Sequence, residues 1–248
     1  MNIEYYKHWS PSLGKDMEMK IYGHAGKPVI IFPSSGGTFI EYEHYQMVEA
    51  CRPFLNAGSI QLYAIDSIDT THTWLNYNIH PSERGVLHIR YEDYLFTELT
   101  PYIRSRSSHH KFMATGCSIG AYHSINFLLK HPDVFDTAIA LSGVYNLNFS
   151  TGNYMDDIIY FNSPLHYLPH LNDPWFLEQL RQSKIVICSG QGPWEKETLM
   201  DTYALKNILA AKHIPAWVDI WGTDVAHDWP WWRLQMPYFL EKLGYQRC

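Results

Sequence analysis

KFMATGCSIGAYHS, residues 111–124, is the stretch from which the fold of this chain is best inferred. The run 112–114 is apolar and follows a polar segment, which is typical of a strand that enters the interior of a sheet. Beyond Gly120, apolar side chains recur at helical spacing as far as Lys130. The stretch therefore predicts a buried strand and a helix, joined by a sharp turn at Ser118.

The turn itself, residues 116–120, has the pattern G-x-S-x-G with Ser118 at its centre. A serine on such a strand-to-helix turn occupies strained backbone, so that its hydroxyl is exposed and the N–H that follows it points at a substrate carbonyl. The strand and the helix pass so close that a side chain two residues before or after the serine would collide, and glycine avoids the collision. Ser118 is therefore the candidate nucleophile, and the backbone N–H of Ile119 is a candidate oxyanion donor.

Further apolar runs predict the other strands of a sheet, at residues 29–32, 60–65, 135–141, 184–189 and 216–221. Segments with a helical period lie between and after them, at residues 45–54, 85–106 with a kink at Pro101, 198–212 and 231–243. This alternation indicates an α/β fold with a mostly parallel sheet covered on both faces, extended by two antiparallel strands within residues 3–24. With 248 residues, of which 46% are hydrophobic, we expect one domain that spans residues 1–248.

Three motifs resemble those of a known family: residues 116–120, PSSGG at residues 33–37, and AHDWPWW at residues 226–232. Together they resemble the α/β-hydrolase superfamily, and more closely its bacterial esterase branch related to esterase D and S-formylglutathione hydrolase. The resemblance implies an α/β-hydrolase fold with a small cap inserted at residues 144–183, a long segment without a sustained period. It also implies that the loop 33–37 supplies a second oxyanion donor. Because Pro33-Ser34 replaces the usual His-Gly, we assign this donor to the N–H of Ser35, with a plain glycine-rich turn as the alternative.

The resemblance places the remaining catalytic residues after later strands, in the chain order serine, acid, histidine. His227 follows the last predicted strand and precedes the final helix, so it is the predicted base that activates Ser118. Glu195 is the first carboxylate after the predicted strand 184–189, and it is the predicted acid that orients the imidazole.

Other carboxylates remain alternatives for the acid. Related esterases often place an aspartate earlier in this loop, where the chain has Gly192 and Pro193. The alternatives are Glu197, Asp201 and Asp224, and the competing interpretation of each is a solvated or capping carboxylate. Asp228, beside His227, is assigned instead as the N-cap of the final helix.

Aromatic residues make up 15% of the chain, which suggests an aromatic-lined pocket or interface. The candidates for substrate contacts are Trp74, Trp194 and Trp229, whose rings are suited to stacking on a sugar or a phenol.

The net charge, the cysteines and the absence of certain motifs indicate which partners, location and cofactors to expect. The net charge of −6, without a basic patch, argues against nucleic acids and anionic membranes as partners. The four cysteines are widely scattered, a spacing that indicates free thiols, so a cytoplasmic location is expected. No H-E-x-x-H motif occurs, and Gly190-Gln191-Gly192 lacks the third glycine of a dinucleotide site, so neither a metal nor a cofactor is expected.

The sequence therefore predicts a cytoplasmic serine hydrolase that cleaves a small carboxylic acyl ester through an acyl-enzyme intermediate. A thioesterase or acyltransferase with the same three residues is the alternative within the enzymes. A non-catalytic binding protein on a hydrolase fold is the alternative from another class. The acyl group, the alcohol, the pathway and the oligomeric state stay open, and a homo-oligomer is compatible with the sequence.

Overall fold

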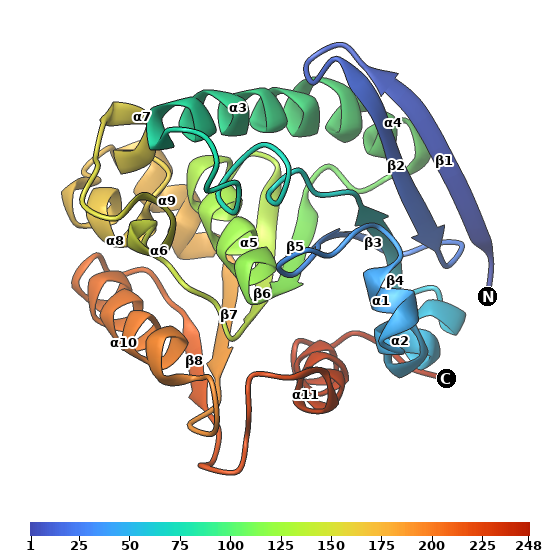
Figure 1. Ribbon diagram of the computed structural model, residues 1–248. Coiled ribbons are helices and arrows are strands. Elements are labelled where there is room, and N and C mark those ends of the chain that lie inside the picture. The colour runs from blue at the N-terminus through green and yellow to red at the C-terminus, as the bar shows by residue number, and fades with distance from the viewer.

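The sheet of the computed structural model, which describes residues 1–248, has eight strands (Figure 1). They are β1 (Ile3–Ser10), β2 (Lys15–Tyr22), β3 (Lys27–Phe32), β4 (Ile60–Ile65), β5 (Phe112–Cys117), β6 (Phe135–Leu141), β7 (Lys184–Ser189) and β8 (Trp217–Ile220). Their order is β1-β2-β4-β3-β5-β6-β7-β8. β2 pairs antiparallel with β1 and β4, and all other pairs are parallel. The predicted mostly parallel sheet with antiparallel N-terminal strands is confirmed.

The central strands are continuously apolar because both of their faces are covered. In β3, Ile30 and Phe32 belong to one hydrophobic core, whereas Val29 and Ile31 belong to a second core on the opposite face. This alternation is the period of two that strand geometry imposes. Every residue of β4 and β5 is buried, so the turn that follows β5 starts from the centre of the molecule.

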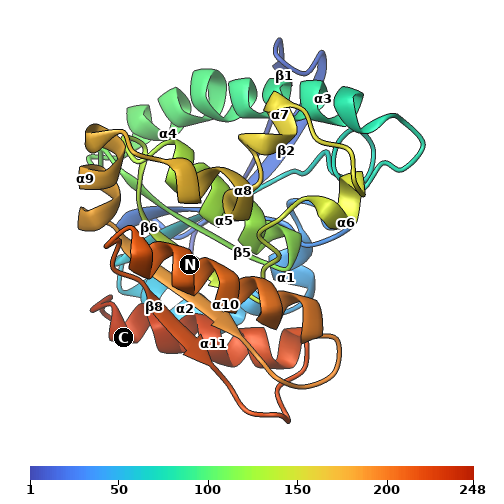
Figure 2. The same ribbon diagram turned by 90° about the vertical axis from the view of Figure 1, so that its left-hand side faces the viewer.

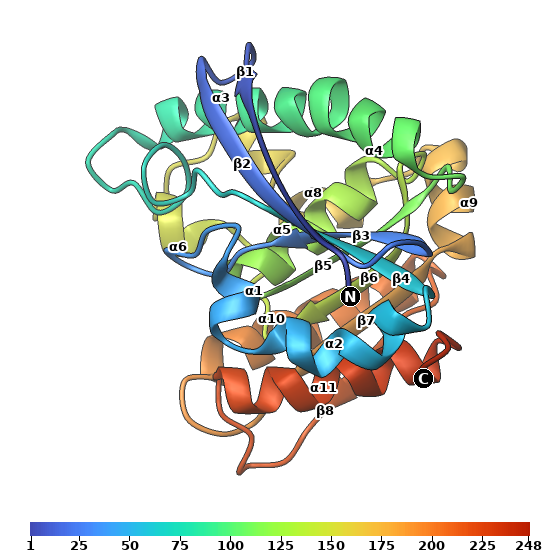
Figure 3. The ribbon, with the colours of Figure 1, turned by 90° about the vertical axis from the view of Figure 1, so that its right-hand side faces the viewer.

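Helices cover both faces of the sheet (Figures 1 and 3). One face carries α3 (Pro81–Asp93), η1 (Tyr94–Leu99), α4 (Thr100–Arg106), α5 (Ile119–Lys130) and α10 (Lys196–Ala211). The other face carries α1 (Glu41–His44), α2 (Met47–Asn56) and α11 (Trp229–Lys242), and α2 and α11 lie side by side. None of the helices has the length and apolar character that crossing a membrane requires.

The segment between β6 and β7 folds into short helices beside α5 and α10 (Figure 2). These are α6 (Asn148–Thr151), α7 (Asp157–Tyr160), α8 (Pro164–Tyr167), the 3-10 helix η2 (Leu168–His170) and α9 (Pro174–Gln182). Tyr167, Leu168 and Leu180 anchor the segment in the first core. This is the segment for which the sequence predicts a cap.

Two predicted helices differ in detail from those of the structure. The helix 85–106 continues as α3, η1 and α4, and η1 is a π-helix that ends just before Thr100-Pro101. Proline lacks an N–H, so a bond of the ladder is missing there, and the wider π turn accommodates the gap. The helix predicted at 45–54 corresponds to α2, which begins two residues later because Gln46 before it adopts a φ of 61°. The short helix α1 precedes the predicted range.

A buried contact between Asp69 and His123 ties the loop after β4 to helix α5. Asp69 Oδ2 lies 2.7 Å from His123 Nε2, and Asp69 Oδ1 accepts a hydrogen bond from the Thr73 hydroxyl at 2.6 Å. The side chains of Asp69 and His123 are only 5% and 2% exposed. Burial favours the neutral acid, but His123 and Thr73 outweigh it and lower the pKa of Asp69 to about 2. The loop is therefore held to α5 by an ionised carboxylate.

The Asp69→Asn variant should lose about 2 kcal/mol of unfolding free energy near neutral pH. Because the folded-state pKa lies below the unfolded one, this contribution is fully present above about pH 4 and is lost as the pH falls toward about 2. The difference from wild type should therefore shrink in urea denaturation curves recorded from about pH 6 down to about pH 3. Asp133→Asn, at an exposed carboxylate after α5, is the control. A difference that does not change with pH would contradict the assignment.

Candidate active site

Ser118 lies on the turn between β5 and α5, with a φ of 57° and a ψ of −121°. A positive φ is costly for any residue other than glycine, so neighbouring structure must impose it. The serine is half-buried, while the residues on either side of it are buried. The turn thus presents one hydroxyl at the carboxyl edge of the sheet.

The two glycines of the turn are required by a backbone-to-backbone contact. A Cβ on Gly116 would lie 2.5 Å from the carbonyl carbon of Gly120 and 2.6 Å from the carbonyl oxygen of Phe32. A Cβ on Gly120 would overlap the same oxygen and approach the Pro33 carbonyl. The collision predicted from the sequence is confirmed. The contact also brings the loop after β3 against the first turn of α5.

In the loop after β3 the backbone N–H of Ser34 is bonded, whereas those of Ser35, Gly36 and Thr38 have no acceptor within the protein. The N–H and hydroxyl of Ser34 donate to Glu41 at 2.8 and 2.5 Å, and the Gly37 N–H donates to the Ser34 carbonyl at 2.9 Å. Burial raises the pKa of Glu41, although the bonds from Ser34 oppose the rise. The N–H of Ser35 has no acceptor within the protein. Ile119 begins α5, where the first N–H groups of a helix also lack helical acceptors.

Glu195 is fully buried in the turn between β7 and α10. Its Oε1 accepts the Ser142 hydroxyl at 2.5 Å, and its Oε2 accepts the hydroxyls of Ser189, at 3.2 Å, and Thr198. Burial alone would raise the pKa of Glu195, but the neighbouring His227 and the hydroxyls of Ser142 and Thr198 outweigh burial and lower it. The buried acid is therefore held as a carboxylate.

His227 meets this carboxylate from the loop between β8 and α11. Its Nδ1 lies 3.5 Å from Glu195 Oε2, within ion-pair range but longer than a hydrogen bond, and its side chain is 19% exposed. The two loops are tied together by their backbones: the His227 N–H donates to the Pro193 carbonyl at 3.0 Å, and the Gly192 N–H donates to the Val225 carbonyl at 2.9 Å. The histidine is thereby placed beside the acid.

Ser142, directly after β6, connects the acid to the nucleophile turn. Its hydroxyl donates to Glu195 and accepts the indole N–H of Trp232 at 2.9 Å. The Trp232 ring packs edge-on against His227, with the ring centroids 5.0 Å apart. The preceding carbonyl, that of Leu141, accepts the Ser118 N–H at 2.9 Å. The turn at Ser118, the carboxylate of Glu195 and the imidazole of His227 thus lie around Ser142 and Trp232 at the carboxyl edge of the sheet.

A family model described as "Putative esterase" matches residues 10–243. The chain belongs to this esterase family. No curated protein sequence shows significant similarity to the esterase.

Solved structures share the fold of the esterase over almost its whole length. A ferulic acid esterase is 15% identical, with a TM-score of 0.76, over 98% of this chain and 97% of the other. The serine hydrolase FphF of Staphylococcus aureus is 15% identical, with a TM-score of 0.73, over 98% of each chain. An S-formylglutathione hydrolase from Agrobacterium tumefaciens is 13% identical, with a TM-score of 0.74, over 99% and 95%. These likenesses show that the esterase has the α/β-hydrolase fold.

The other carboxylates near this edge have different surroundings in the esterase. Glu197 and Asp224 are exposed. Asp201 accepts the backbone N–H groups of Tyr145 and Asn146, at 2.6 and 3.2 Å, so it fixes the chain after β6. No contact between these three side chains and His227 occurs, whereas Glu195 has one.

The tryptophans predicted to contact substrate differ in exposure. Trp74 is completely buried with Ile119 and Tyr122 beneath the elbow. Trp229 is 7% exposed and stacks on Tyr45, with ring centroids 4.5 Å apart. Trp194, next to the acid, is 87% exposed and has a φ of 67°. Among the three, only Trp194 has a ring face open to a ligand in this structure. Asp228 accepts the Trp229 N–H at 2.7 Å and caps α11 as predicted.

Four residues around the acid were not identified from the sequence: Ser142, Ser189, Thr198 and Trp232. Ser142 and Ser189 end β6 and β7, and serines at strand ends are common in turns, so their role is not visible in the pattern. Thr198 lies one helical turn after Glu195, a spacing that does allow a contact and is the one signal available.

Trp232→Phe should lower the unfolding free energy by about 1 to 2 kcal/mol, because it removes the buried indole donor to Ser142 while keeping an aromatic ring against His227. Trp231→Phe is the matched control, since the adjacent Trp231 is half-exposed and makes no side-chain hydrogen bond. Urea denaturation of both variants measures the difference. Equal losses would mean that the hydrogen bond to Ser142 contributes nothing to stability.

Proposed function

We propose that the esterase is a serine hydrolase that cleaves a carboxylic acyl ester through an acyl-enzyme intermediate, with Ser118, His227 and Glu195 as its catalytic residues. The observation that carries the proposal is the buried, ionised Glu195 beside the imidazole of His227. A carboxylate in this position stabilises the imidazolium that forms when histidine accepts the proton of a serine.

The reaction then has two steps. Ser118 Oγ attacks the ester carbonyl while His227 Nε2 takes its proton, and Glu195 holds the Nδ1–H on the other side of the ring. Collapse of the tetrahedral intermediate breaks the C–O bond, and the imidazolium returns the proton to the departing alcohol. Water then repeats the sequence on the acyl-serine, which releases the acid and regenerates the hydroxyl.

The oxyanion is bound by the N–H groups of Ile119 and Ser35. Two observations support Ser35 over Ser34: the Ser34 N–H is already bonded to Glu41, and the Ser35 N–H has no protein acceptor. Donors that are fixed before the reaction stabilise the developing charge without reorganisation. Glu41 therefore acts indirectly, because it holds the loop that presents Ser35.

The substrate is a small carboxylic ester, and Trp194 offers an exposed ring for stacking on its aromatic or sugar portion. The segment 144–183 forms the cap beside this site. The esterase is expected in the cytoplasm, since all four cysteines are free thiols. Residues 1–248 act as one domain.

Ser118→Ala and His227→Ala should each lower kcat for p-nitrophenyl acetate by on the order of 10³-fold or more. The double variant should lose little more than either single one, because the two groups act in the same step. A fluorophosphonate should label wild type and not Ser118→Ala. Turnover that survives in Ser118→Ala, or losses that multiply in the double variant, would overturn the assignment. A panel of esters, acyl-CoA and acetylated sugars would define the acyl donor that the esterase prefers.

Glu195→Gln should lower kcat between about 10²- and 10⁴-fold, because the amide keeps the shape but favours the wrong imidazole tautomer. Glu197→Gln, two residues away and exposed, should remain within about twofold of wild type. The same p-nitrophenyl ester assay compares them, and urea denaturation establishes that both variants are folded. If Glu197→Gln proves the more damaging change, the acid has been assigned to the wrong residue.

A further inference from the structure

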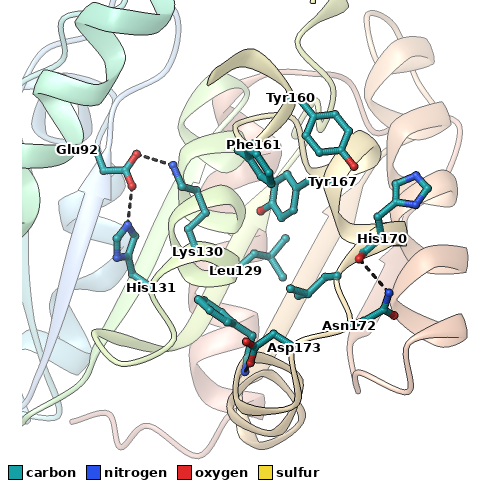
Figure 4. A pocket seen from close by; sticks show the side chains of 12 residues that line it. Glu92, Leu129, Lys130, His131, Tyr160, Phe161, Tyr167, His170, Asn172 and Asp173 are labelled. Carbon is teal, nitrogen blue, oxygen red and sulfur yellow. Dashed lines mark hydrogen bonds and ion pairs between the residues drawn. The ribbon is translucent and has the colours of Figure 1, made fainter. Parts of the chain in front are cut away.

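A cavity lies away from Ser118, between the C-terminal end of α5 and the helices of the segment 144–183. Its volume is about 600 Å³, a size suited to a molecule of one or two rings. Figure 4 shows its lining residues, which come from α3, from the end of α5 and from the segment that contains α7, α8, η2 and α9. Ser118 precedes the first residue of α5 and Lys130 is the last, so the two sites lie about 18 Å apart along this helix.

Apolar and aromatic side chains form most of the wall. Leu129 and Tyr167 are buried at the base of the cavity, and Phe161 is 57% exposed. Tyr160 packs edge-on against Phe161, with ring centroids 5.0 Å apart, and Phe176 contributes a further ring. Rings in edge and stacked orientations favour a flat aromatic guest over an aliphatic chain, because aromatic pairs gain energy beyond the area they bury.

The charges at one end of the cavity compensate each other. Lys130 Nζ lies 2.5 Å from Glu92 Oε2, and His131 Nε2 lies 2.7 Å from Glu92 Oε1. Burial opposes ionisation of Glu92, but its partners His131 and Lys130 lower its pKa to about 2. The exposed Asp173 adds a negative charge to the lining. An anion would therefore find no net positive charge here, which favours an uncharged ligand.

One donor of the ammonium group remains unused. Lys130 has three N–H groups, and its only acceptors in the protein are Glu92 and the Asn162 side-chain oxygen, the latter at 2.9 Å. Lys130 lines the cavity, and its side chain is 18% exposed. An oxygen acceptor on the guest would satisfy this donor.

We propose that this cavity is a binding site for an uncharged phenol of one or two rings, whose ring packs among Tyr160, Phe161 and Phe176 and whose oxygen accepts the free N–H of Lys130. The proposal does not depend on the chemistry at Ser118. Since the cavity joins α5 to the segment 144–183, a bound phenol would hold these two parts of the esterase together.

The test uses 2-naphthol as the probe, with naphthalene as the matched compound without the oxygen. Calorimetric titration of the full chain should show saturable binding of one 2-naphthol, with the same Kd in Ser118→Ala and after labelling with a fluorophosphonate. Naphthalene should bind about tenfold more weakly, because it offers no acceptor to the ammonium group. In Lys130→Met the affinities of the two compounds should become equal.

Phe176→Ala should weaken 2-naphthol binding about tenfold, whereas Trp175→Ala should leave it within about twofold. Trp175 is the matched control because it is the adjacent, half-exposed residue of α9 and does not line the cavity. The proposal is overturned if 2-naphthol does not bind, if the fluorophosphonate displaces it, or if wild type binds naphthalene equally well. Equal effects of Phe176→Ala and Trp175→Ala would overturn it as well.

Discussion

The contact between the end of β3 and the first turn of α5 is the constraint on which the arrangement of this site depends. The carbonyl oxygen of Phe32 occupies the space that a side chain at Gly116 or Gly120 would need. A contact between backbones cannot be relieved by a change of rotamer, so it resists small movements of either element. It holds Ser118 in its strained conformation and positions the loop that begins at Pro33. The serine and the unbonded N–H of Ser35 are thus placed by the same contact.

The groups around Glu195 stabilise its carboxylate without neutralising its negative charge. A fully buried carboxylate is costly unless its oxygens are hydrogen-bonded. Here the donors are neutral hydroxyls, from Ser142, Ser189 and Thr198, and no lysine or arginine pairs with Glu195. The hydroxyls keep the group ionised without cancelling its charge. The one cation that can form beside it is the imidazolium of His227, which therefore gains the full attraction of the carboxylate.

The strands were the most predictable part of the fold. The predicted ranges 60–65, 135–141 and 184–189 match β4, β6 and β7. A short apolar run bounded by turn residues is what a strand buried on both faces of a parallel sheet requires. Helix ends and the kind of interruption were less predictable: the π-helix before Pro101 and the start of α2 after Gln46 are local departures that a continuous helical period does not reveal.

The meeting of Glu195 and His227 could be predicted from the order of the strands, whereas the orientation of the tryptophan side chains could not. Glu195 and His227 follow successive strands, and strands of a parallel sheet end at one edge, so their meeting is a consequence of topology. The exposure of a tryptophan ring has no comparable signal. Trp74 and Trp229 pack inside because their rings complete apolar clusters, one of them around Ile119. The sequence around a tryptophan in a loop does not indicate whether its ring faces the core or the solvent.

Trp194 combines two unfavourable features, a positive φ and an exposed indole. Strained backbone of this kind persists only where surrounding structure imposes it. Here the bonds from His227 to the Pro193 carbonyl and from Gly192 to the Val225 carbonyl hold the turn on both sides. These are the bonds that bring the histidine loop against the acid loop. The conformation of Trp194 is therefore a consequence of holding His227 beside Glu195, and its exposed ring stands at the same edge of the sheet as Ser118.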